Sequence, residues 1–100
     1  MSTSGTELRE ALARRVTASD EALSFDLSDG RTITVPLTLF PRLSNGSAKE
    51  RANWRLIGGG VGIHWPDLDE DISVESLLAG RKSGESRESL RRWLQARNAG

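Results

Sequence analysis

The chain has 100 residues, a formal net charge of zero at pH 7 and no cysteine. This length corresponds to one domain. The 14 Lys and Arg residues balance the 14 Asp and Glu residues, so overall charge does not favour nucleic acid as a partner. The lack of cysteine excludes disulfides, thiolate metal sites and cysteine nucleophiles. No apolar run approaches the ~20 residues of a membrane-spanning helix and no signal peptide is visible, so we expect a cytoplasmic protein.

The N-terminal part of the chain predicts a tail and a short helix ahead of the first strand. Thr6 is a residue type that caps helices, so we assign residues 1–14 to a tail followed by a helix of about two turns. Residues 15–19 alternate apolar and polar side chains, which is typical of a strand. A Ser-Asp-Glu turn at 19–21 then reverses the chain.

The clearest local signal is a β-hairpin over residues 23–35, where apolar and polar side chains alternate on both sides of an Asp-Gly turn. A two-residue loop would pair Phe25 with Thr34 and mix apolar and polar side chains on one face. A three-residue loop over 28–30 pairs Phe25 with Ile33 and keeps one face apolar. It also places a glycine where such loops need a left-handed residue, so we predict the three-residue loop.

A helical connection is expected after this hairpin. Pro36 ends the strand because it lacks an amide proton, and residues 37–40 are expected to form one helical turn. Ser47 followed by Glu50 matches a capping box, which predicts a short helix over 47–53.

A second hairpin, over residues 53–66, carries two of the three tryptophans and the only histidine. Alternating side chains on either side of consecutive glycines at 58–60 predict two paired antiparallel strands. Trp65 and His64 then point to opposite faces of the second strand. Pro66 is expected to end that strand.

An acidic run and a short helix are predicted next. Residues 67–71 are expected to form an acidic loop. Ser73 caps a predicted helix over 74–79 that ends at Gly80. The inward side of this helix is expected to carry Val74, Leu77 and Leu78.

The last part of the chain, residues 81–100, predicts a linker and a C-terminal helix. Residues 81–86 are rich in glycine, serine and charge, which is typical of a linker. The helix over 87–98 has apolar residues at helical spacing, namely Leu90, Trp93 and Leu94. This apolar side either docks on the helix's own domain or is offered to another chain.

Together these elements predict an α+β fold. The expected order is three strands, a helical connection, two strands and then helices. We therefore predict a small antiparallel sheet, made of a three-strand meander plus a hairpin and covered by short helices. The predicted core domain spans residues 15–80, with 1–14 before it and 81–100 after it.

Two groups of short strings carry a resemblance to a known family. The first is Ala-Asn-Trp-Arg-Leu-Ile-Gly at 52–58 with Gly-Ile-His-Trp-Pro-Asp-Leu-Asp-Glu-Asp-Ile-Ser at 62–73. The second is Leu-Ser-Asp-Gly-Arg at 27–31, with Val-Pro-Leu at 35–37 and Phe-Pro-Arg-Leu at 40–43. Through these strings the chain resembles the bacterial family of domains of unknown function numbered 2442, over about residues 16–80.

The resemblance implies a small prokaryotic α+β domain with no established catalytic residues. Some members precede a helix-turn-helix DNA-binding domain and others occur beside small toxin-like proteins, which implies a regulatory role. The single helix predicted after Gly80 is not a helix-turn-helix, so direct operator binding is not expected.

His64 is the first candidate for a functional side chain. Histidine titrates near neutrality, which suits a general base or a pH switch. An enzyme would need His64 to work with Asp67 or Asp69 and a metal. The simpler interpretation is a strand histidine hydrogen-bonded to a neighbouring carboxylate such as one of these two, because no nucleophile or other catalytic partner is recognisable. We therefore predict a non-enzymatic protein with no cofactor and no metal site.

Two further motifs have plain structural interpretations. Residues 67–71 resemble a calcium loop, but the glycine at the sixth position and the glutamate at the twelfth are missing, which favours a solvated acidic turn. The glycines between 58 and 62 lack the lysine and the following helix of a phosphate-binding loop, which favours a tight turn.

The prediction from sequence is a regulatory, antitoxin-like or regulator-associated module that binds another protein, with a homo-oligomer left open. Each tryptophan is either a core residue or an interface residue. The predicted partner-binding residues are Arg55, His64, Trp65 and Trp93. The alternative is a nucleic-acid-associated accessory protein, which steep weakening of binding by salt would favour. The residues that would contact phosphates in that case are Arg87, Arg91 and Arg92.

Overall fold

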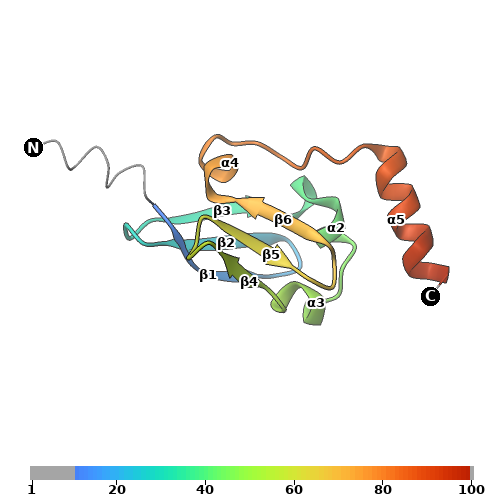
Figure 1. The fold of residues 1–100 in the computed structure, drawn as a ribbon, viewed down its shortest axis with the longest axis horizontal. Helices are drawn as coiled ribbons and strands as arrows, with labels where there is room; N and C mark the ends of the chain where they lie inside the picture. Colours follow the sequence, from blue (N-terminus) through green and yellow to red (C-terminus); the bar gives the residue numbers. More distant parts are fainter. Residues whose placement is uncertain (1–10, 100) are drawn as a thin grey trace, which may run out of the picture.

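The computed structural model describes residues 11–99 and contains two three-stranded antiparallel sheets with short helices, which confirms the α+β fold class (Figure 1). The strands are β1 (Ala13–Ala18), β2 (Ala22–Leu27), β3 (Thr32–Pro36), β4 (Arg55–Ile57), β5 (Gly62–Trp65) and β6 (Glu70–Ser73). The helical elements are η1 (Leu37–Leu39), α2 (Pro41–Ser44), α3 (Ala48–Ala52), α4 (Val74–Leu78) and α5 (Arg87–Ala99). The helix predicted from Thr6 lies largely outside the described residues.

The first sheet has the order β1-β2-β3 and contains the hairpin whose register was predicted. Phe25 pairs with Ile33 and Leu23 pairs with Val35, so the three-residue loop is confirmed. Gly30 has a φ of 93°, the left-handed conformation that this loop requires. Leu23, Phe25 and Leu27 consequently share one buried face of β2.

The second sheet has the order β4-β5-β6 and contains the predicted tryptophan hairpin. Leu56 pairs with Ile63, and the turn between the two strands is made by the consecutive glycines. The acidic segment was expected to be a loop throughout, and this was wrong for its second half, since Glu70 begins a third strand. That strand pairs with β5, with Ile72 opposite Ile63.

The core lies between the two sheets and the helical connection. Its largest fully buried side chains are Trp65, Phe25, Leu23, Leu43, Ile63 and Leu68. The indole of Trp65 donates a hydrogen bond from Nε1 to the backbone oxygen of Arg51 at 3.0 Å, which satisfies its polar group inside the core.

The helical connection follows the predicted signals closely. Ser47 and Glu50 form both hydrogen bonds of a capping box at the start of α3, as predicted. The single turn expected after Pro36 is present as η1. The helix α2 was not predicted. It begins at Pro41, a residue type that is favoured at the first position of a helix.

The helix α4 begins at the predicted residue, ends one residue earlier than predicted, and exposes one residue expected to be buried. The Ser73 side chain accepts a hydrogen bond from the amide of Ser76, and Gly80 adopts a φ of 75° at the C-terminal end. Leu77 is buried, whereas Leu78 is 45% exposed. The expectation that Leu78 faces inward was wrong because so short a helix turns only part of its surface toward the sheets.

The two sheets touch at the tip of the second hairpin. The amide of Ala13 on β1 donates to the backbone oxygen of Gly60 at 2.8 Å. A Cβ atom at Gly60 would lie 2.6 Å from the backbone oxygen of Ala13, and this residue has a φ of 122°. Only glycine fits here, because both the contact and the conformation exclude a side chain.

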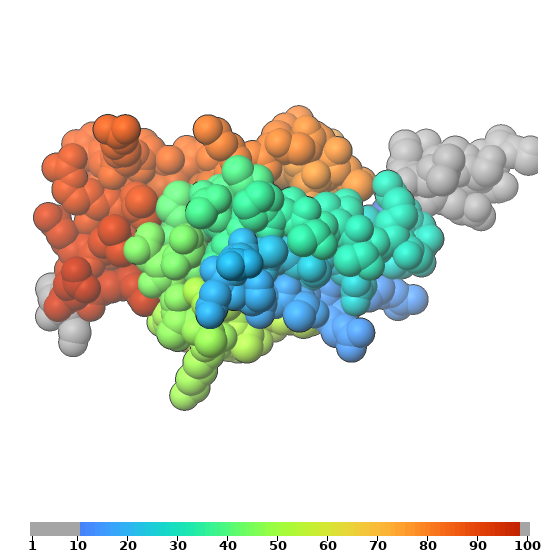
Figure 2. Space-filling model, turned by 180° about the vertical axis from the view of Figure 1, so that it is seen from behind, coloured from blue at the N-terminus to red at the C-terminus, as the bar shows by residue number. Residues whose placement is uncertain are grey.

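The C-terminal helix lies at the opposite end of the molecule from α4 (Figure 1). Seen from behind, the red α5 packs against the green segment that contains α2 and α3 (Figure 2). The linker before it has no helix or strand, and the amide of Ser83 in this linker donates to the backbone oxygen of Leu39 at 3.0 Å.

Candidate functional site

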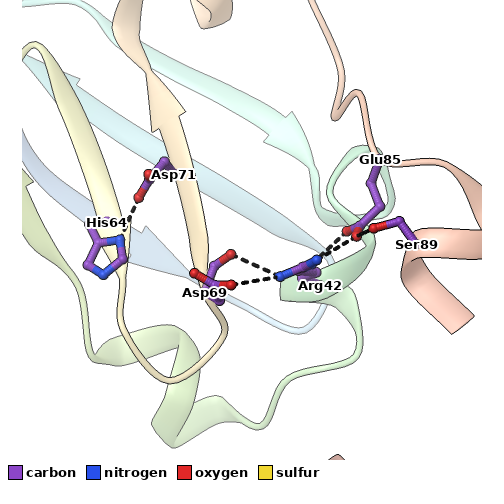
Figure 3. Close-up of polar contacts among 6 residues, drawn as sticks. All are labelled: Arg42, His64, Asp69, Asp71, Glu85 and Ser89. Atoms are coloured by element: carbon purple, nitrogen blue, oxygen red, sulfur yellow. Dashed lines mark hydrogen bonds and ion pairs between the residues drawn. The ribbon is translucent and has the colours of Figure 1, made fainter. Parts of the chain in front are cut away.

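His64 lies on the outer face of β5, and its Nδ1 is hydrogen-bonded to a carboxylate oxygen of Asp71 on β6 (Figure 3). The two residues are direct cross-strand partners, so the contact follows from the sheet register. The sequence indicated a carboxylate partner such as Asp67 or Asp69. The partner is Asp71 instead, because β6 brings this residue alongside β5.

The acidic residues after Pro66 point to different partners. Asp67 accepts a hydrogen bond from the side-chain amide of Asn53 at 2.9 Å. Asp69 lies beside Arg42, with 3.4 Å between Nη1 and Oδ2, and Asp71 contacts the imidazole on β5. Within residues 11–99 no three metal-ligating side chains come together in a way that could hold an ion.

The outer face of the second sheet carries two of the predicted partner-binding residues and lacks a third. Arg55 is exposed and lies opposite His64 in the register. Trp65, the third, has no exposed surface and is therefore not available to a partner on this face. Its side chain points to the inner face, as β-strand alternation requires when His64 points outward.

An apolar groove lies at the tip of the same hairpin. It has a volume of about 700 Å³, and its apolar lining comes from Ala11, Leu12, Val61, Val74 and Leu78. Val61 is 54% exposed. Ile57, on the strand before the turn, is 40% exposed. Exposed apolar side chains gathered at one place are more typical of binding surfaces than apolar residues scattered singly.

A second cavity, of about 410 Å³ and mainly polar, lies between β6, α2 and the linker. Burial raises the pKa of Glu70 in this cavity to about 7, although the nearby Arg42 guanidinium acts in the opposite direction. Arg42 itself forms two bonds of 2.7 Å to the carboxylate of Glu85 (Figure 3). Arg81 and Lys82 also line the cavity, so charges of both signs meet there.

The helix α5 is held to the body by paired charges on either side of Trp93. The ring of Trp93 is half-buried and packs against the core, with the guanidinium carbons of Arg42 and Arg97 at 5.1 and 4.7 Å from its centroid. Arg97 donates to both carboxylate oxygens of Glu50, at 3.2 and 2.9 Å. Hydrogen bonding to Arg97 lowers the pKa of Glu50 to about 2. Trp93 therefore contacts its own domain and is not presented freely to another chain.

The three arginines of the nucleic-acid alternative are exposed on α5. Arg92 lies 4.0 Å from Glu88, one helical turn away. The structure thus places Arg87, Arg91 and Arg92 on solvated surface of the helix, with Trp93 and Arg97 on the side that meets the body.

Sequence reasoning missed the residues that hold α5 in place. Arg42 was noted only within the Phe-Pro-Arg-Leu string at 40–43, and Glu50 only as part of a capping box. The available signal was the four-residue spacing of Glu85, Ser89, Trp93 and Arg97, which puts them along one side of α5 and the segment just before it. Their partners on α2 and α3 are distant in sequence and carry no such pattern.

The family of the chain follows from comparison with known proteins. The model of the family described as "Protein of unknown function (DUF2442)" matches residues 13–83. The chain belongs to this family. The match covers both sheets of the DUF2442 domain and ends in the linker before α5. No curated protein matches the chain.

Two solved structures resemble this DUF2442 chain. A crystal structure of a protein of unknown function from Rhodospirillum rubrum has 29% sequence identity and a TM-score of 0.65, and the match covers 76% of this chain and 94% of that chain. A solution NMR structure of an uncharacterized protein from Chromobacterium violaceum has 18% identity and a TM-score of 0.67, with 89% of this chain and 82% of that chain covered. The second likeness concerns the fold alone. None of the helices in residues 11–99 has the length and apolar character to cross a membrane.

Proposed function

We propose that this DUF2442 chain is a non-enzymatic protein-interaction module that binds a partner protein through the apolar groove at the tip of the β4–β5 hairpin. The observation that carries the proposal is the exposure of Val61 and Leu78, at 54% and 45%, which both line that groove. Covering these half-exposed side chains would contribute about 1 kcal/mol each to binding.

The partner expected at this groove offers an apolar segment. The lining is apolar apart from Ser73 and Glu75, so the partner contributes apolar side chains at the centre and a polar or basic group near Glu75. Arg55 and His64, on the outer face of the same sheet, would extend the contact surface. We place this module in the cytoplasm and in a regulatory role, as an antitoxin-like or regulator-associated domain, following the resemblance noted from the sequence.

Site-specific crosslinking in cells tests the proposal. A photo-crosslinkable amino acid replaces Glu75 at the rim of the groove, and the control places it at the exposed Thr38 on η1. We expect one discrete protein adduct from position 75 and none of the same mass from position 38. The purified adduct partner should then bind the unmodified chain in isothermal titration calorimetry.

Substitutions in the groove complete the test. The double variant Val61→Asp/Leu78→Asp should lose binding to the purified partner, because two charges would have to be buried. The matched control, Thr38→Asp/Ser44→Asp, adds the same charge at exposed positions and should bind normally. Equal binding by both variants would refute the groove as the partner-binding site. A partner that proves to be nucleic acid, released by salt, would favour the alternative of arginine contacts on α5.

A further inference from the structure

The side of α5 that meets the body has a regular chemical order. Glu85, Ser89, Trp93 and Arg97 follow one another at four-residue intervals, which places them along one side of the helix and its N-terminal extension. Glu85, Trp93 and Arg97 meet residues of the body or pack on the core, and Ser89 donates to the carboxylate of Glu85 at 2.7 Å. From its N-terminal to its C-terminal end, the docking side therefore presents a carboxylate, a hydroxyl, an indole and a guanidinium.

The surface that receives this side is fixed by the body of the domain. The Nη1 atom of Arg42 on α2 donates to the backbone oxygen of Asp69 at 3.1 Å, which orients the guanidinium toward the linker (Figure 3). Glu50 on α3 accepts from the amide of Ser47 at 2.9 Å within the capping box. One cation and one anion are thus held in place by contacts that do not involve α5, and such preorganisation favours binding.

The order of charges on the surface matches that of the helix. Arg42 meets the carboxylate before the N-terminal end of α5, and Glu50 meets the guanidinium in its last turns. A negative group near the N-terminus of a helix and a positive group near the C-terminus also agree with the helix dipole. Only a helix that runs in this direction satisfies both charges.

The family match includes the receiving surface but not the helix that docks on it. It covers residues 13–83, which include Arg42 and Glu50, and it ends before α5 begins. The receiving surface thus belongs to the family domain, while the helix that fills it lies outside the matched segment.

We propose that the face formed by α2 and α3 is a recognition site for an amphipathic helix, which α5 fills within the same chain. The partner is a helix of another protein that carries a carboxylate, a small polar residue, an aromatic residue and an arginine at four-residue intervals. Such a helix displaces α5 and makes the same bonds to Arg42 and Glu50. This surface lies at the other end of the molecule from the groove of the proposed function and does not depend on it.

A synthetic peptide of residues 84–99 with an N-terminal fluorophore tests this inference. Its binding is followed by fluorescence anisotropy with the full chain and with the full chain carrying Trp93→Ala/Arg97→Gln, which weakens the docking of its own helix. We expect at least ~10-fold tighter binding to the double variant, because in the parent chain the tethered α5 competes at an effective concentration in the millimolar range.

Charge reversal shows whether the bound peptide occupies the α2–α3 face. Adding Glu50→Arg to the double variant should weaken binding of the peptide by ~10-fold or more. A peptide with Arg97→Glu should regain affinity for the chain that carries Glu50→Arg but not for the double variant. The groove variant Val61→Asp/Leu78→Asp, combined with the double variant, should bind the original peptide unchanged. This arm separates the inference from the proposed function.

Three results would overturn the inference. The first is a peptide that binds neither chain, although the tryptophan emission of a single Arg97→Gln variant, compared with that of the parent, shows that this change has released α5. The second is a peptide affinity that is unchanged by the reversal of charge at position 50. The third is a parent chain that sediments as a dimer requiring both Glu50 and Arg97, which would identify the occupant as the α5 of a second copy and not a helix of a partner protein.

Discussion

Replacement of the buried Arg51 by methionine should destabilise the protein by about 3 kcal/mol. The residue is only 7% exposed. Its Nη1 donates to the backbone oxygens of Leu43 and Gly46, and its Nη2 lies 3.1 Å from a carboxylate oxygen of Asp20. Methionine retains most of the apolar stem of the side chain, so the substitution tests the hydrogen bonds more than the packing.

The magnitude follows from what each lost bond leaves behind. The backbone oxygens of Leu43 and Gly46 would face an apolar side chain, and each lost bond from a charged donor is worth about 1.5 kcal/mol. The contact with Asp20 adds little, because that side chain is 92% exposed and its charge is screened by water.

Urea unfolding of the parent and of Arg51→Met, followed by tryptophan fluorescence, measures the difference. With a slope of about 1.5 kcal/mol per molar urea, the midpoint should fall by about 2 M. Lys49→Met is the matched control, since this residue is exposed on the same helix α3. If Arg51→Met and Lys49→Met unfold within about 1 kcal/mol of each other, the buried guanidinium is not the stabilising group that we infer.

Three further predictions concern the hairpin tip, the polar cavity and α5. Gly60→Ala should destabilise the fold by about 2 kcal/mol more than Gly59→Ala in urea titrations, because its Cβ would clash with β1 whereas at Gly59 there is open space. Burial raises the pKa of Glu70 from 4.5 to about 7, so the folded chain keeps a proton that the unfolded chain has released. Stability should therefore fall as pH rises from about 4.5 to 7, by about 1 kcal/mol after allowance for solvent screening, and Glu70→Gln should remove this slope. The guanidinium of Arg97 on α5 lowers the pKa of Glu50 to about 2. The docking of α5 should therefore be complete above pH 4.5 and weaken as pH falls toward 2. A red shift of Trp93 emission would report this weakening.

Each of these outcomes has a clear opposite. Equal stability of the two glycine variants would show that the hairpin tip can move away from β1. If stability rises between pH 4.5 and 7 in the parent but not in Glu70→Gln, folding lowers the pKa of Glu70 and does not raise it. Unchanged Trp93 emission down to pH 2 would mean that the apolar contacts of α5 hold it without the ion pair.

The elements that the sequence predicted well are those whose pattern is local. In the first hairpin, apolar residues alternate on both strands, so only one register keeps Phe25 and Ile33 on the same face. The capping box at Ser47 and the stop at Gly80 depend on residues within one turn of the helix ends. Such signals are complete within a few residues and do not depend on the rest of the fold.

The strand β6 was missed because its signal is not local. Asp69, Glu70 and Asp71 precede Ile72 without apolar alternation, and charged residues are depleted in strands. The segment becomes a strand because Ile72 is buried opposite Ile63 on β5. Missing β6 also hid the partner of His64, since only the register of this strand brings Asp71 alongside the imidazole.

The candidate sites divide in the same way. Arg55 and His64 lie on the outer face, as alternation along the second hairpin indicated. Trp65 was interpreted as either a core residue or an interface residue. The choice between these two depends on how the second sheet packs against the rest of the domain, which no local pattern shows. The burial of Arg51 could not be predicted, because a charged residue on a short helix is normally solvated and its carbonyl partners lie in α2 and in the turn that follows it.

Each sheet is completed within one uninterrupted stretch of the chain, the first by residue 36 and the second between residues 55 and 73. Chains emerge from the ribosome N-terminal end first, so the first meander can close while the second is still being synthesised. During that interval the side chains of Leu23 and Phe25 have no opposing layer, because Ile63 and Trp65 have not yet appeared. The nascent polypeptide should therefore be most prone to aggregation, and most dependent on chaperones, between these two moments of its synthesis.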